Sequence, residues 1–141
     1  MDLVTAIGFA SSILTFIEFS WGLVTGTYKV YKSAAGTAIE NAHINTVIDD
    51  LQKITEDLSP EVDLKTRHGK ALCQLAEKCN ELSKDLLKIL EKLQATDRNP
   101  KGQSMKRKLM SMRKENEISC IEKRLHKYRS QIIMRLNFML R

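Results

Sequence analysis

The first two dozen residues constrain the fold most strongly, because Leu3 to Val24 is a nearly uninterrupted apolar stretch that carries one charge, Glu18. As a helix this stretch would be about 33 Å long, close to the hydrocarbon thickness of a bilayer. A signal peptide is a poor interpretation, because Asp2 stands where positive charge is typical and no small-residue cleavage pattern follows. The stretch is therefore expected to be either a membrane-inserting helix or the central helix of a bundle.

Helical periodicity gives this stretch a weakly amphipathic character, with a face of small and polar residues. That stripe consists of Thr5, Gly8, Ser12, Thr15, Phe19, Gly22 and Gly26, with Ser11, Glu18 and Thr25 beside it. A helix that is apolar nearly all round is usually buried, which favours the central helix of a bundle. Both interpretations hold together if the helix is buried at rest and released on activation.

Three kinds of candidate residue follow if this helix acts on a membrane. The membrane-inserting candidates are its apolar side chains, namely Leu3, Val4, Ile7, Phe9, Ile13, Leu14, Phe16, Ile17, Trp21, Leu23 and Val24. Glu18 is the pore-lining candidate, because a carboxylate in lipid is costly unless it faces water. Gly22 and Gly26 are hinge candidates, since a glycine weakens a helix by up to about 1 kcal/mol relative to alanine. We expect the helix to run to about Lys32 and to break within residues 33–37.

Three further apolar repeats with alternating spacings of three and four residues predict three more helices. The repeats are Ile44, Val47, Leu51, Ile54 and Leu58; Leu72, Leu75, Cys79, Leu82, Leu86, Ile89 and Leu93; and Ile118, Ile121, Leu125, Tyr128, Ile132, Leu136 and Met139. Residues 105–114 are a candidate for a short basic helix. The sequence therefore predicts an all-α antiparallel bundle of four to five helices in a single domain, residues 1–141. A coiled-coil dimer is the competing interpretation, but packing within one short chain is simpler.

Two further expectations concern side chains in the predicted helices. Several apolar residues lie off the main repeats and are expected to widen the core-facing surfaces: Leu87, Leu90, Ile133, Met134, Phe138 and Leu140. Cys73, Cys79 and Cys120 lack the spacing of a zinc site, and we expect buried free thiols. No metal or other cofactor is expected.

Positive charge is concentrated in the last third of the chain. Residues 1–97 hold 10 Lys and Arg against 14 Asp and Glu, whereas residues 98–141 hold 13 against 3. The candidates for contact with anionic lipid are Lys106, Arg107, Lys108, Arg113 and Lys114, because such clusters attract polyanions. The alternative is a solvated basic helix face. The sequence does not favour nucleic-acid binding, since no stacking aromatics, zinc module or recognition motif accompany the charges.

The sequence shows no arrangement typical of an enzyme. His43, His68 and His126 are scattered without a nucleophile at motif distance, and they are expected to be surface residues. The acidic pair Asp49 and Asp50 is expected on a solvated helix face. No phosphate-binding glycine motif is present. We therefore expect a non-enzyme.

The opening residues 1–19, followed by a Y-x-x-Y-x-S-A-x-G motif at residues 28–36, resemble the N-terminal domain of fungal NOD-like receptors, of the HeLo-like and SesA type. The resemblance continues through residues 45–58, 72–93, 121–125 and 128–131. It departs from the family at residues 103–114, which lack the expected tryptophan.

This resemblance implies a helical bundle whose N-terminal helix is exposed on receptor oligomerisation and permeabilises the plasma membrane in programmed cell death, as in heterokaryon incompatibility and innate immunity. It implies a cytoplasmic protein that self-associates, moves to anionic membrane phospholipids on activation, and is followed in the full-length chain by a nucleotide-binding module. The rival hypothesis is a helical interaction module that recruits a downstream effector without entering lipid.

Overall fold

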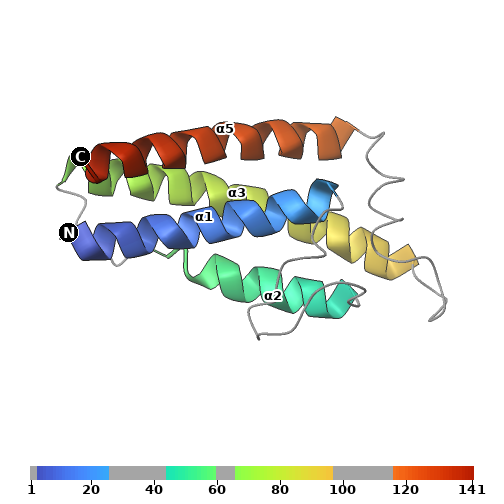
Figure 1. Ribbon diagram of the computed structural model, residues 1–141. Coiled ribbons are helices and arrows are strands. Elements are labelled where there is room, and N and C mark those ends of the chain that lie inside the picture. The colour runs from blue at the N-terminus through green and yellow to red at the C-terminus, as the bar shows by residue number, and fades with distance from the viewer. Residues whose placement is uncertain (1–2, 26–43, 60–65, 97–115) are drawn as a thin grey trace.

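The computed structural model describes residues 3–25, 44–59, 66–96 and 116–141, and these ranges form an all-α bundle (Figure 1). Its helices are α1 (Leu3–Thr25), α2 (Ile44–Glu56), α3 (Arg67–Thr96) and α5 (Asn116–Met139). Successive helices run in opposite directions, so α1 begins and α5 ends at the same end of the bundle (Figure 1). No strand occurs within the described ranges. The predicted fold class is confirmed.

The apolar repeats predicted from the sequence point into one core. Each of their residues is buried, apart from the partly buried Leu136 and from Ile44 and Leu93, whose side chains lie outside the described set. The repeats place one apolar side chain on the same helix face at every turn, and burying those faces against one another removes them from water. Intramolecular packing therefore accounts for the heptad-like spacing.

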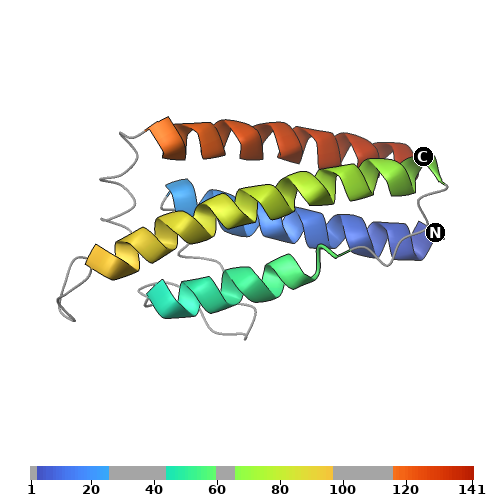
Figure 2. The ribbon, with the colours of Figure 1, turned by 180° about the vertical axis from the view of Figure 1, so that it is seen from behind.

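Local signals explain where two of the helices begin and end. Thr66 caps α3, because its side-chain oxygen accepts a hydrogen bond from the backbone N–H of Gly69 at 2.9 Å. At the end of α2, the backbone N–H of Leu58 donates to the carbonyl of Thr55 at 2.9 Å, which turns the chain before Pro60. In both views α2 stops short of the bundle end where α1 begins (Figures 1 and 2).

The expectation that all off-repeat apolar residues widen the core is wrong for α5. Leu90 is buried and Leu87 packs against the core, as expected. Ile133, Met134 and Phe138, however, are 41%, 49% and 46% exposed, and Leu140 is exposed as well. The reason is geometric: α5 packs against α1 and α3, and these four side chains are not fully covered by either helix. This leaves an apolar surface at the end of α5.

Candidate functional site

The N-terminal helix α1 is the central element of the bundle. It packs against α2, α3 and α5, and its buried side chains include Ile13, Phe16 and Ile17. Its most apolar 18-residue window has a mean hydropathy of 1.6, so among the described residues it is the one helix long and apolar enough to cross a membrane. A buried core helix meets the same criterion. The question left open by the sequence, whether this helix is buried at rest, is answered by its position.

The membrane-inserting candidates divide into three groups in the folded bundle. Leu3 and Val4 are exposed, whereas Ile7, Phe9, Leu14 and Trp21 are partly buried and Ile13, Phe16, Ile17, Leu23 and Val24 are buried. The apolar surface of α1 is therefore largely occupied by contacts with the other helices. Insertion into lipid requires that α1 separate from α2, α3 and α5.

The stripe of small and polar residues predicted on α1 faces solvent along the first part of the helix. Thr5, Gly8, Ser11 and Thr15 are exposed, and a Cβ atom added to Gly8 would meet no atom within 4 Å. Further along the stripe, Phe19 and Gly22 are buried. Three hydroxyls of α1 donate hydrogen bonds to backbone carbonyls one turn earlier. Ser12 donates to Gly8 at 3.3 Å, Thr15 to Ser11 at 2.9 Å and Thr25 to Trp21 at 2.7 Å. These bonds stay within α1, so they need no partner from another helix.

Glu18 links α1 to α5 through an ion pair at the surface. Its Oε1 accepts a hydrogen bond from Nε of Arg129 at 3.0 Å, and the two side chains are 35% and 53% exposed. In the resting bundle Glu18 therefore reaches both the surface and a basic partner. An exposed pair of this kind contributes about 0–1 kcal/mol. It is a weak restraint on α1.

Several sequence candidates lie outside the described residues or in unexpected places. Gly26, the expected helix end near Lys32, and the anionic-lipid candidates Lys106, Arg107, Lys108, Arg113 and Lys114 all fall outside the described ranges. The other hinge candidate, Gly22, is buried inside a helix that continues to Thr25.

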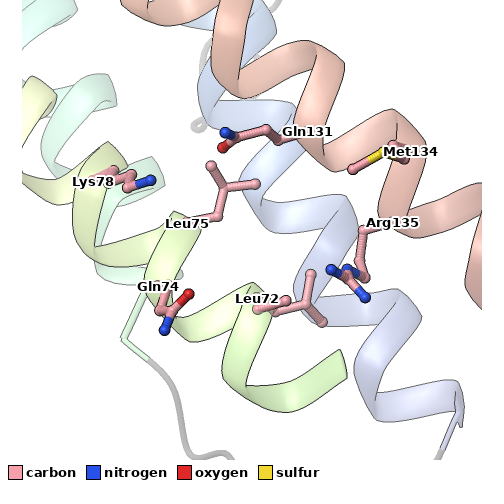
Figure 3. Close-up of a pocket in the computed structure, with 8 residues that line it drawn as sticks. Leu72, Gln74, Leu75, Lys78, Gln131, Met134 and Arg135 are labelled. Atoms are coloured by element: carbon pink, nitrogen blue, oxygen red, sulfur yellow. The ribbon is translucent and has the colours of Figure 1, made fainter. Parts of the chain in front are cut away.

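A pocket of about 210 Å³ between α3 and α5 was not found by sequence reasoning (Figure 3). Its walls combine apolar Leu72, Leu75 and Met134 with Gln74, Gln131, Lys78 and Arg135. Arg135 lies beside the partly buried His68, with Nη1 at 3.3 Å from Nδ1. Because a guanidinium only donates, Nδ1 of His68 is the acceptor. The lining residues come from two distant segments, so no local motif signals the pocket.

Two expectations about cysteine and aspartate side chains are corrected by the structure. Cys73 and Cys79 are buried free thiols as expected, but Cys120 is exposed beside a pocket of about 520 Å³ between α3 and α5. Burial raises the pKa of Cys79 to about 12, although the charge of Arg124 acts in the opposite direction. The solvated face expected for the acidic pair is wrong for Asp50, which is 1% exposed. Within the described ranges no group of His, Cys, Asp and Glu is arranged to hold a metal ion.

Comparison of the chain with family models, with curated proteins and with solved structures gave no match.

Proposed function

We propose that this chain is a membrane-permeabilising effector domain whose helix α1 leaves the bundle and inserts into lipid. The observation that carries the proposal is the dual character of α1, which has the length and hydropathy of a membrane span while its side chains form the centre of the bundle core. The resting bundle keeps its apolar side chains out of water. Release would expose them, and a bilayer would then be the environment that buries them again.

Two features of α1 support action as a pore-forming helix. Its exposed stripe of small and hydroxyl-bearing residues provides a polar side for a lumen, and Glu18 lies beside that stripe. Its ion pair with Arg129 is exposed, so separating α1 from α5 does not leave an unpaired charge buried. In this proposal receptor oligomerisation, driven by a downstream nucleotide-binding module, releases α1 from a cytoplasmic protein and brings it to the plasma membrane. The resemblance to fungal receptor domains supports this order of events.

The experiment that tests the proposal is a reversible cross-link between α1 and α5. Glu18→Cys and Arg129→Cys, in a Cys120→Ser background, are joined by a bismaleimide with a cleavable disulfide; Cys73 and Cys79 are buried and remain unlabelled. We expect the cross-linked protein to release no dye from liposomes containing phosphatidylserine. Adding reductant should restore leakage, because α1 is then free to separate.

A matched control joins α3 to α5 and leaves α1 free. Asp85 and Arg124 form a comparable ion pair at 2.7 Å, so Asp85→Cys and Arg124→Cys accept the same reagent. This control should leak with or without reductant. Leakage from the α1–α5 cross-linked protein would contradict the proposal. A protein that causes no liposome leakage but recruits a partner would favour the interaction module instead.

Deleting residues 2–20 is a poor substitute for the cross-link, because it removes buried core residues such as Ile13 and Phe16.

A further inference from the structure

All six large apolar side chains that are exposed among the described residues lie at one end of the bundle. They are Leu3 and Val4 at the start of α1, Ile133, Met134 and Phe138 in the last turns of α5, and Leu140 directly after α5. Because α1 and α5 are antiparallel, the start of one lies beside the end of the other (Figure 1). We call this surface the apolar end. Clusters of exposed apolar residues of this kind are typical of interaction sites.

Among the described residues, the charged side chains in the helix ends that form the apolar end have one sign. The three helix ends there, residues 3–10, 66–74 and 130–141, contain Arg67, Lys70, Arg135 and Arg141 and no Asp or Glu. The guanidinium of Arg141 lies 5.3 Å from the centre of the Phe138 ring, so charge and apolar surface are in direct contact. A partner for this surface must therefore accept apolar side chains and supply negative charge.

The pocket between α3 and α5 opens beside the apolar end. Met134 belongs to both, and Arg135 and Lys78 line the same pocket together with Gln74 and Gln131 (Figure 3). Within the part of the chain that the structure describes, neither Lys78 nor Arg135 forms a salt bridge with a carboxylate. Two cations and two amides around an apolar floor suit a phosphate or carboxylate group that is attached to an apolar body.

We propose that the apolar end docks the resting bundle on an anionic bilayer, with a headgroup phosphate held between Lys78 and Arg135. Phe138, Leu140 and Val4 would then reach the boundary between headgroups and acyl chains. This inference rests on the proposed function and names the surface on which the bundle meets the membrane before α1 is released. Docking in this way would also present the first residue of α1 to the lipid.

Charge favours a bilayer over a second copy of the chain. A two-fold dimer through the apolar end would bring the same cationic residues, including Arg135 and Arg141, toward each other, and like charges across an interface repel. An anionic bilayer instead supplies negative charge over the whole surface, and it buries apolar side chains at the same time.

The test is sedimentation with phosphatidylcholine vesicles, with and without phosphatidylserine, using the cross-linked protein in which α1 cannot separate. Lys78→Gln with Arg135→Gln should weaken binding to anionic vesicles roughly twenty-fivefold at low salt, because each charge near the surface contributes roughly fivefold. Phe138→Ser should weaken it about tenfold at low and high salt alike, because its contribution is apolar. Lys84→Gln with Lys88→Gln, a matched loss of two exposed lysines elsewhere on α3, should change binding little.

The outcomes distinguish a failure of docking through the apolar end from a failure of membrane permeabilisation by α1. Unchanged vesicle binding by both the Lys78/Arg135 and Phe138 variants would overturn docking through the apolar end. A concentration-dependent dimer that is lost with Phe138→Ser, without vesicle binding, would also overturn it and would assign the surface to a second copy. If the cross-linked protein docks but the reduced protein never leaks, docking stands and the permeabilising function is wrong. If leakage is normal in variants that no longer dock, the permeabilising function stands and docking is not the step that precedes release of α1.

Discussion

At the scale of single residues, Glu18 is expected to have different surroundings in the resting bundle and in the proposed pore. In the resting bundle it pairs with Arg129 across 111 positions of sequence. In a pore it would face the lumen beside Ser11 and Thr15, since a carboxylate in lipid is costly away from water. Neither role could be read from local sequence, because periodicity places Glu18 on a helix face without saying which helix lies opposite. The lone charge in an apolar stretch was the signal that singled it out.

Exchanging the two charges separates these roles. The double variant Glu18→Arg with Arg129→Glu keeps an ion pair between α1 and α5, so thermal unfolding should change by less than about 1 kcal/mol. In planar bilayers the same variant should shift ion selectivity from cations toward anions, because charge on a pore wall sets selectivity. The single variant Glu18→Gln should unfold much like the wild type but lose cation preference. Unaltered selectivity in both variants would remove Glu18 from the pore wall.

The three cysteines give a prediction about pH. The pKa of Cys79 is raised above its ordinary value of 9.0, so the folded state holds this proton more tightly than the unfolded chain. Its stabilising contribution is complete below pH 9.0 and is lost as the pH rises toward about 12. Urea unfolding above pH 9.0 should therefore depend less on pH in Cys79→Ala than in the wild type.

In the native protein at neutral pH a thiol reagent should label Cys120 first; rapid labelling of Cys79 would contradict its burial.

At the scale of elements, the repeats of three and four residues predicted α2, α3 and α5 well. An apolar side chain at every turn of a helix indicates a buried face from local sequence alone. The repeat positions of α3 from Leu72 to Ile89 are buried as this pattern predicts. The same reasoning failed at Ile133, Met134 and Phe138, because their exposure depends on which helix covers the end of α5. The pocket at Lys78 and Arg135 escaped prediction for the same reason: it is formed by segments far apart in the chain.

The strongest repeat can be tested by one substitution. Leu86 is 2% exposed in the middle of α3, so Leu86→Ala should destabilise the bundle by about 2–5 kcal/mol through lost burial and a residual cavity. Leu140→Ala is the matched control; its side chain is 65% exposed, and the expected change is within about 0.5 kcal/mol. Chemical denaturation followed by circular dichroism measures both. Equal stability of the two variants would mean that α3 does not contribute to the core as described.

At the scale of the whole molecule, the bundle combines two opposite requirements on one helix. Its core needs α1, which contacts each of the other described helices, while the proposed activity needs α1 to leave. The apolar end and the excess of positive charge in residues 98–141 would place the bundle at an anionic surface before that change. In the proposed mechanism, membrane contact would then supply the apolar environment that replaces the lost helix contacts.

The single tryptophan of the chain allows the most direct measurement. Trp21 lies on α1 and is partly buried in the resting bundle, so its fluorescence reports the position of this helix alone. With vesicles whose acyl chains carry bromine, which quenches tryptophan on contact, we expect quenching to appear together with leakage of anionic liposomes. The α1–α5 cross-linked protein should show neither until reductant is added. Leakage without quenching, with Trp21 instead accessible to iodide in water, would contradict insertion of α1.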